Sequence, residues 1–269
     1  MILVIWYAIL ALVVIFRSPV IDFLDSISTM LQTFKETIQK VIAHASKTLE
    51  SHKTTIGIIA GHLTIARLFS GVLVCLDIRK NGTERISSLP FVGGLMLALG
   101  SLRYAKVLGD DVMLQVNFES AVLNSIFCIF YIVHSQDKWN EILQPLSYSM
   151  GTVAILWGYC EWEDPALIKF RYGLIMTMLM LFLSAVPLLN LKKVIAQKDA
   201  SEIPLVMSLM GTMVTFSWLL YSIIITNGFL IVQNLIGFLI FATRLLLIYL
   251  YSGEFARQED DQGCLSFEL

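Results

Sequence analysis

The sequence predicts an all-α integral membrane protein with seven transmembrane helices, arranged as two parallel three-helix repeats joined by a linker helix. Three observations lead to this prediction: the composition, the length of the apolar segments and an internal repeat. Of the 269 residues, 57% are hydrophobic and only 15% are charged, whereas a soluble domain carries about 25% charged residues. The mean hydropathy is +0.74. We therefore expect the lipid bilayer to be the environment of this chain.

The composition also argues against several function classes. A net charge of −2 gives no indication of a nucleic-acid partner. The sequence contains no C-x-x-C pair, no H-E-x-x-H motif and no Walker-type phosphate loop. The histidines are scattered along the chain, at His44, His52, His62 and His134. We therefore expect no metal site, no cofactor and no enzymatic activity.

Seven apolar segments are long enough to cross a bilayer, whose hydrocarbon core requires about 20 mostly apolar residues per helix. Polar loops separate these segments. They cover residues 56–76, 90–108, 113–134, 143–160, 172–191, 204–225 and 229–251.

The charges of the loops predict the orientation of the chain, because basic loops stay in the cytoplasm. Three basic residues lie in loop 77–88 and three in loop 191–203, whereas loops 109–111 and 161–164 are acidic. The C-terminus is therefore predicted to be cytoplasmic. The one glycosylation sequon, at Asn81, falls in a cytoplasmic loop, so we expect no glycan there.

The N-terminal extension, residues 1–55, combines an apolar segment at 1–16 with an amphipathic heptad helix at 20–49. The apolar seam of that helix is spaced alternately four and three residues apart: Val20, Leu24, Ile27, Leu31, Phe34, Ile38, Val41 and Ala45. One interpretation is an extra signal-anchor span followed by a surface helix, whose seam hints at association into a homo-oligomer. The other is an extension that is dispensable or comes from the gene model.

The two halves of the membrane region repeat one another. Residues 101–117 align without gaps on residues 218–234. The aligned pairs are Leu102 with Leu219, Tyr104 with Tyr221, and Asn117 with Asn234. Upstream of these segments, each half carries a Ser-x-x-Pro motif, ending at Pro90 and Pro204.

This repeat predicts the domain organisation. Residues 56–134 form the first three-helix repeat, 143–160 the linker helix and 172–251 the second repeat, followed by a polar cytoplasmic tail at 252–269 that we expect to be unstructured. Because three is odd, the linker helix is required to give both repeats the same orientation.

The second repeat carries a specific combination of motifs. They are Ala185-Val186-Pro187-Leu188, Ser201-Glu202-Ile203-Pro204, Trp218, Tyr221 and Gln233-Asn234-x-x-Gly237. Through them the chain resembles the SWEET (MtN3/saliva) sugar transporters, the animal type more than the plant type, over about residues 56–251. The resemblance implies facilitative, bidirectional transport of a mono- or disaccharide by alternating access.

The resemblance also implies the site residues. Asn117 and Asn234 match paired asparagines that line the sugar pocket, and Trp218 matches a pocket aromatic. Pro90, Pro187 and Pro204 match three members of a proline tetrad that permits bending, and Gly71 stands where plant members have the first proline of that tetrad. With Tyr104 and Tyr221, these four are our hinge and gating candidates. The departures from the family are Ser101 for a frequent Trp, Ala105 and Ser120 for frequent glycines, and Arg244 where Gln is common.

Helical geometry adds residues to the candidate sugar site. Asn117, Ser120 and Asn124 are spaced i, i+3, i+7, so they share one helix face. An Asn amide both donates and accepts hydrogen bonds, as sugar hydroxyls require. The alternative for the asparagines is interhelical hydrogen bonding. Arg244, seven residues before the end of its span, is expected to extend to the headgroups.

The predicted function is therefore facilitative transport of a small neutral sugar across the plasma membrane, or alternatively across the Golgi or another endomembrane. Two alternatives remain. The first is an amino-acid carrier of the organellar PQ-loop type, although Phe91 and Leu205 follow the loop prolines where that type has Gln. The second is a diverged, non-transporting paralogue that acts through partners, which the weaker first repeat and the heptad seam would suit.

Overall fold

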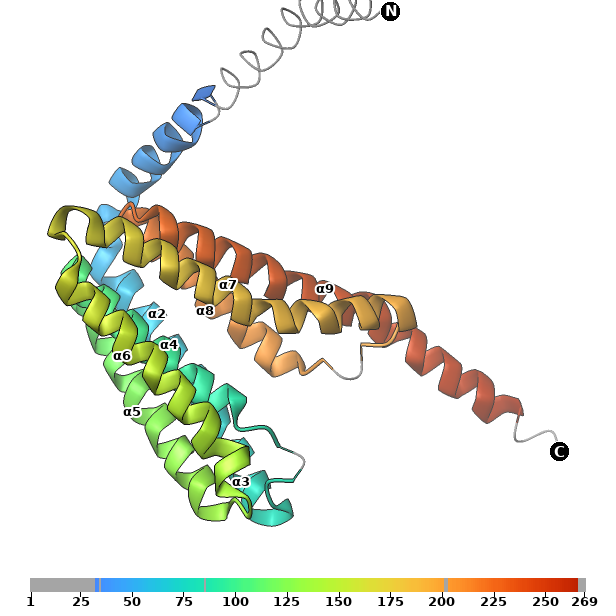
Figure 1. Ribbon diagram of the computed structural model, residues 1–269. Coiled ribbons are helices and arrows are strands. Elements are labelled where there is room, and N and C mark those ends of the chain that lie inside the picture. The colour runs from blue at the N-terminus through green and yellow to red at the C-terminus, as the bar shows by residue number, and fades with distance from the viewer. Residues whose placement is uncertain (1–31, 34, 85, 201–202, 266–269) are drawn as a thin grey trace, which may run out of the picture. The chain divides into compact units, whose positions relative to one another are not determined.

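The computed structural model describes residues 32–33, 35–84, 86–200 and 203–265, and gives the backbone alone for 183–193 and 252–265. In this part of the chain every regular element is a helix, which confirms the predicted all-α fold (Figure 1). The chain divides into two units, residues 1–50 and 51–269. The α-helices of the second unit are α2 (Lys53–Leu68), α3 (Ser70–Asn81), α4 (Leu89–Leu108), α5 (Asp111–His134), α6 (Gln144–Trp162), α7 (Pro165–Gln197), α8 (Leu205–Ile224) and α9 (Gly228–Leu265), and a short helix, η2 (Trp139–Leu143), precedes α6.

Six helical stretches of the described residues are long and apolar enough to cross a membrane. They are Lys35–Asn81, Leu89–Leu108, Asp111–His134, Pro165–Phe182, Leu205–Ile224 and Gly228–Tyr251. Helices suit this role because every backbone hydrogen bond is made within the segment. The predicted linker, α6, is not among the six, because polar residues along it and at its ends, such as Gln144, Ser147 and Glu161, lower the mean hydropathy of this 19-residue helix.

In the first unit, residues 35–49 are helical, and Ile38 and Val41 of the predicted seam are 41% and 63% exposed. The apolar segment 1–16 and the earlier seam residues lie outside the described residues.

Three element boundaries differ from the sequence prediction. α7 begins at Pro165 rather than at residue 172, because the Asp164 side chain caps it by accepting a hydrogen bond from the Ala166 N–H at 2.8 Å. The first span, predicted as one helix over 56–76, is divided at Phe69 into α2 and α3. The tail, predicted to be unstructured, continues α9 as far as Leu265, since helix-favouring residues follow the span without a Gly–Pro stop.

The connections between the second and third helices of the two repeats are built alike. Gly109 follows α4 with φ +71°, and Asp110 then caps α5 by accepting a hydrogen bond from the Met113 N–H at 2.8 Å. In the second repeat, Thr226 has φ +51°, and Asn227 accepts from two N–H groups at the start of α9. These are equivalent positions in the alignment of the two halves. The repeat thus extends to a left-handed residue followed by a capping residue.

The third helix of each repeat lies between the other two. α5 packs against α4 and also against α2 and α3, while α9 packs against α7 and α8. The halves meet where α2 packs against α8 and where α4 packs against α7, which are equivalent pairs under the repeat. α6 packs against α4.

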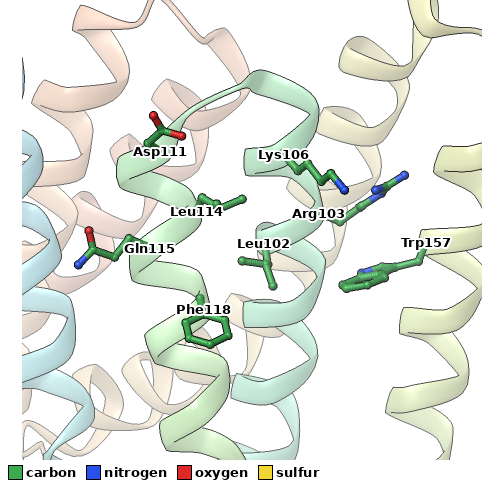
Figure 2. Close-up of a pocket in the computed structure, with 8 residues that line it drawn as sticks. All are labelled: Leu102, Arg103, Lys106, Asp111, Leu114, Gln115, Phe118 and Trp157. Atoms are coloured by element: carbon green, nitrogen blue, oxygen red, sulfur yellow. The ribbon is translucent and has the colours of Figure 1, made fainter.

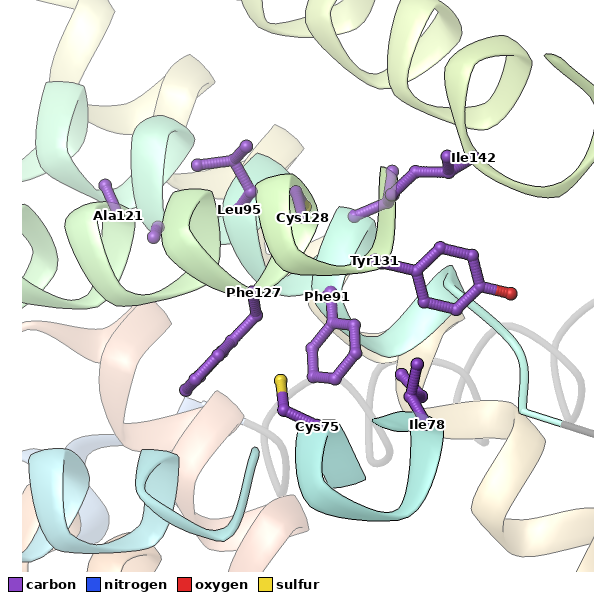
Figure 3. Packing of buried hydrophobic residues seen from close by; sticks show 11 residues of the cluster. Cys75, Ile78, Phe91, Leu95, Ala121, Phe127, Cys128, Tyr131 and Ile142 are labelled. Carbon is purple, nitrogen blue, oxygen red and sulfur yellow. The ribbon is translucent and has the colours of Figure 1, made fainter. Parts of the chain in front are cut away.

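A core of buried side chains joins α3, α4 and α5 at one end of the first repeat (Figure 3). The rings of Phe91 and Phe127 lie 5.4 Å apart, and the Tyr131 hydroxyl donates to the Ile86 carbonyl at 2.7 Å. A Cβ at Gly71 would lie 2.6 Å from the Phe127 ring. Only a glycine therefore allows the start of α3 to approach α5 so closely.

Candidate functional site

A cavity of about 430 Å³ lies in the second unit, walled by α2, α3, α4 and α5, with Met180 of α7 and Met207 of α8 completing its wall. Its volume falls in the range of about 300–1,000 Å³ that is usual for small-molecule sites. Six predicted residues line it: four sugar-site candidates, Ser101, Asn117, Ser120 and Asn124, and two hinge candidates, Gly71 and Pro90.

The polar face of the cavity belongs to α5. Asn117 Nδ2 donates to the Met113 carbonyl at 2.7 Å, and Asn124 Nδ2 donates to the Ser120 carbonyl at 2.8 Å. These bonds to the preceding turn hold each amide in a fixed orientation. Among the described residues, the Asn117 carbonyl oxygen and its second N–H have no partner, so both are available to a ligand.

Gly94 of α4 makes room for Asn124. A Cβ at this position would lie 2.5 Å from the Asn124 side-chain oxygen. The Asn124 side chain is buried against the α4 backbone, with 4% of the residue exposed. Close packing of α4 on α5 therefore sets the position of this amide at the cavity wall.

Two predicted sugar-site residues of the second repeat do not line this cavity. Asn234 Nδ2 donates to the Leu230 carbonyl at 2.8 Å, which is the bond that Asn117 makes in the first repeat. Trp218 Nε1 donates to Thr64 Oγ1 at 2.8 Å, and Thr64 is itself a lining residue. Trp218 thus contacts the wall of the cavity rather than its interior.

The two tyrosines of the repeat join the halves of the protein in a crossed arrangement, which we call the tyrosine clasp (Tyr104, Asn227, Tyr221 and Asp110). The Tyr221 hydroxyl of α8 donates to the Asp110 carboxylate, at 3.0 and 2.9 Å from its two oxygens. Asn227 Nδ2 donates to the Tyr104 hydroxyl of α4 at 3.1 Å. Each tyrosine therefore bonds the residue that caps the third helix of the other repeat.

The clasp lies at one end of the interface between the repeats, near the C-terminal ends of α4 and α8. Tyr104 and Tyr221 are buried, with 2% and 1% of their surfaces exposed. The Tyr104 ring also stacks on Tyr172 of α7, with 5.9 Å between centroids. Sequence reasoning missed Asp110 and Asn227, although they occupy equivalent positions in the alignment of the two halves.

The proline candidates lie at different kinds of position. Pro90 is the second residue of α4 and lines the cavity, while Pro204 is the capping residue before α8. Pro187 lies inside α7, whose helix continues through it, and its side chain is outside the described residues.

A second cavity, of about 380 Å³, lies against α4, α5 and α6 (Figure 2). It is lined by Leu102, Arg103, Lys106, Asp111, Leu114, Gln115, Phe118 and Trp157. In Figure 2, Leu114 lies between Asp111 and Arg103, and the apolar Leu102 and Phe118 lie below these charged groups. None of the sugar-site candidates lines it, and Arg103 is engaged in an ion pair with Glu161.

A cluster of charged side chains lies at the connection from α6 to α7, and none of its residues lines the 430 Å³ cavity. The Tyr159 hydroxyl donates to Glu163, and Arg171 pairs with the same carboxylate at 2.6 Å. Together they lower the pKa of Glu163 to about 2. Within the described residues, no three His, Cys, Asp or Glu side chains gather as metal ligands would.

Comparison with known proteins identifies the family. Residues 54–139 and 170–256 match the family described as sugar efflux transporters for intercellular exchange. The chain belongs to this family. The two matched segments lie on either side of α6, and the resemblance to SWEET transporters predicted from the sequence is confirmed.

Individual relatives agree with this assignment. Sugar transporter SWEET1 of Caenorhabditis elegans is 28% identical over 68% of this chain and 60% of its own length. SWEET1 of Drosophila pseudoobscura is 25% identical over 70% of this chain and 84% of its own length. The chain thus matches less than two thirds of the first relative and most of the second. Both are described as transporters rather than enzymes, in agreement with the sequence prediction.

A solved structure of a eukaryotic SWEET transporter has the same fold. It superimposes with a TM-score of 0.70 over 77% of this chain and 99% of its own, at 22% sequence identity. The membrane fold predicted from the sequence is therefore confirmed.

Proposed function

We propose that the protein carries a mono- or disaccharide down its gradient by alternating access, with the 430 Å³ cavity as the sugar site. The observation that carries this proposal is the cavity itself, whose wall combines the Asn117 amide, the hydroxyls of Ser101 and Ser120 and other polar groups with apolar side chains. A sugar presents both hydroxyls and C–H surfaces, so this mixture suits it.

Uniport is favoured because no carboxylate is among the described residues that line the cavity. Coupling to protons would need a titratable group exposed to the cargo path. The amide and hydroxyl groups that line the cavity can bind a sugar whether or not an ion gradient is present.

The repeats supply a route for alternating access. In our proposal, the tyrosine clasp keeps one end closed while the cargo exchanges at the other. Opening the closed end requires both hydrogen bonds of the clasp to break as α4 and α8 move apart. The division between α2 and α3 at Phe69 would allow bending beside the cavity, where Gly71 lies. As α8 and α9 move, Trp218 and Asn234 would join the sugar site.

The proposed location is the plasma membrane, with the C-terminus in the cytoplasm. A membrane-impermeant protease or an epitope-tag antibody applied to intact cells would test the side on which the C-terminus lies. Detection of the tag before permeabilisation would contradict this topology.

Uptake of labelled glucose and sucrose tests the proposed function, in cells that lack their own sugar carriers. Asn117→Ala and Asn234→Ala should each reduce uptake by about tenfold, which corresponds to the loss of one or two hydrogen bonds to the cargo. The matched control is Asn81→Ala, an exposed asparagine at the end of α3 that bonds Asp77 and should leave uptake unchanged. Absence of uptake by the wild-type protein at the cell surface would refute the proposal.

A further inference from the structure

A groove between α4, α5 and α6 is separate from the cargo cavity. It is the cavity of about 380 Å³ shown in Figure 2, and we call it the linker groove because Trp157 of the linker helix α6 forms part of its wall. Its lining residues are all different from those of the 430 Å³ cavity. A ligand of the linker groove therefore need not be the cargo.

The linker groove is charged at one end and apolar along its length. Lys106 lies two residues before the end of α4, and Asp111 is the first residue of α5. Phe118 lies seven residues further along α5, about 10 Å deeper along the helix axis. Leu114, Phe118 and Trp157 have 38%, 59% and 39% of their surfaces exposed. The polarity of the groove thus changes as it does between the headgroups and the hydrocarbon core of a bilayer.

Two contacts fix α6 as a wall of this groove. Trp157 Nε1 donates to the Leu99 carbonyl at 3.2 Å, and one turn later Glu161 pairs with Arg103. Both contacts are spaced by four residues on each helix, so the two helices remain in register over a full turn. All lining residues belong to α4, α5 or α6. The groove is therefore built by packed helices rather than by a loop.

The charged end of the groove has one cation and one carboxylate to offer. Glu161 balances the charge of Arg103. Lys106 and Asp111 are both exposed, and within the described part of the chain neither forms an ion pair. One lies on α4 and the other on α5 (Figure 2). The groove thus presents a positive and a negative group at the same end, above an apolar surface.

We propose that the linker groove binds one membrane phospholipid with a zwitterionic headgroup. The lipid phosphate accepts hydrogen bonds from Lys106, and the lipid ammonium lies against the Asp111 carboxylate. An acyl chain lies along Leu114 and Phe118, beside the ring of Trp157. Basic pockets between membrane helices bind lipid headgroups in this way. An anionic lipid would satisfy Lys106 but would bring a net negative charge close to Asp111. The bound lipid joins the linker helix to the first repeat, whatever cargo the protein carries.

Native mass spectrometry of the full-length protein, stripped of lipid in detergent, tests this inference. The probes are dioleoyl phosphatidylethanolamine, dioleoyl phosphatidylglycerol, dioleoylglycerol and glycerophosphoethanolamine, which separate the acyl chains, the phosphate and the ammonium group. We expect one phosphatidylethanolamine per chain, bound about 10- to 100-fold more tightly than dioleoylglycerol, as hydrogen bonds to charged groups predict. Phosphatidylglycerol should bind less tightly than phosphatidylethanolamine. Glycerophosphoethanolamine should not compete, because it has no acyl chains.

Charge variants locate the headgroup. Lys106→Gln should bring the affinity for phosphatidylethanolamine to within about threefold of that for dioleoylglycerol, because the phosphate loses its charged partner. The matched control is Lys169→Gln, which removes an exposed lysine in the second turn of α7, outside the groove lining, and should change nothing. Asp111→Asn should abolish the preference for phosphatidylethanolamine over phosphatidylglycerol, because an amide does not repel an anionic headgroup.

A filled groove locates the acyl chain. Leu114→Trp places a larger ring in the apolar part of the groove and should prevent retention of the lipid. The matched control is Leu174→Trp on α7, because Leu174 is 39% exposed, as Leu114 is 38% exposed, but does not line the groove. Bound lipid raises the melting temperature. The rise is measured for each variant against its own lipid-free protein, so a variant that folds less stably still reports its lipid dependence.

Four outcomes would overturn the inference. Equal retention of phosphatidylethanolamine and dioleoylglycerol would mean that acyl chains alone bind. Tighter binding of phosphatidylglycerol than of phosphatidylethanolamine would show that the site selects anionic lipid. Unchanged retention in both Lys106→Gln and Leu114→Trp would place the lipid elsewhere. A dimer of the lipid-free protein that Leu114→Trp dissociates would show that a second copy of the chain covers the groove. None of these outcomes bears on the proposed sugar transport, which is measured separately by uptake.

Discussion

Removing the Tyr221 hydroxyl should open the closed end of the protein more often. This hydroxyl donates to both oxygens of Asp110, at 3.0 and 2.9 Å. A hydrogen bond to a charged group contributes about 1.5–3 kcal/mol, which corresponds to a roughly 10- to 150-fold change in the equilibrium between closed and open states. Asp110 keeps its bond to the Met113 N–H, so α5 remains capped in Tyr221→Phe.

Tyr104→Phe provides an internal comparison. Its hydroxyl accepts a bond from the neutral Asn227 amide at 3.1 Å. A neutral hydrogen bond contributes about 0.5–1.5 kcal/mol, or a roughly 2- to 12-fold change. The structure therefore predicts a larger effect for Tyr221→Phe than for Tyr104→Phe, although the two residues are equivalent in the repeat.

The assay is the rate at which a membrane-impermeant maleimide labels a cysteine placed at Ser101, which lines the cavity, in a cysteine-free background. Reagent added on the side of the clasp reacts only when that end opens. Tyr148→Phe serves as the control, because Tyr148 is 69% exposed and lies on α6, outside the clasp. An unchanged labelling rate in folded Tyr221→Phe, or a larger effect of Tyr104→Phe, would show that the clasp does not hold this end closed.

Three further predictions concern particular positions. Gly94→Ala should reduce sugar uptake, because its Cβ would lie 2.5 Å from the Asn124 side-chain oxygen, at a cost of about 1–3 kcal/mol; wild-type uptake would show that Asn124 can move freely. Thr226→Gly should raise thermal stability by about 1 kcal/mol in a detergent unfolding scan, because Thr226 has φ +51°; a lower melting temperature would contradict this. The lowered pKa of Glu163, about 2, predicts stability that is present above its unfolded pKa of about 4.3 and is lost as the pH falls toward 2. Thermal unfolding between pH 3 and 7 should therefore depend less on pH in Glu163→Gln, and an identical pH dependence would rule out this contribution.

The polar face of the candidate sugar site could be predicted from the local sequence. The spacing of Asn117, Ser120 and Asn124 places them on one face of a helix, and all three line the cavity. Asn117 and Asn234 make the same bond to the preceding turn, as equivalent positions in two repeats should. Other boundaries depend on single capping residues, which is why α7 begins earlier than the apolar pattern indicates.

The sequence by itself determined the membrane fold, the approximate positions of the apolar helices and the family. Apolar length, helical periodicity and the repeat are properties of neighbouring residues or of aligned segments, so they can be read without knowing the packing. Only the tertiary structure decided that Tyr104 bonds Asn227, that Trp218 bonds Thr64, and that Arg67 meets Arg244 over Phe241. These contacts join residues more than a hundred positions apart, and their distances depend on how α2, α4, α8 and α9 pack together.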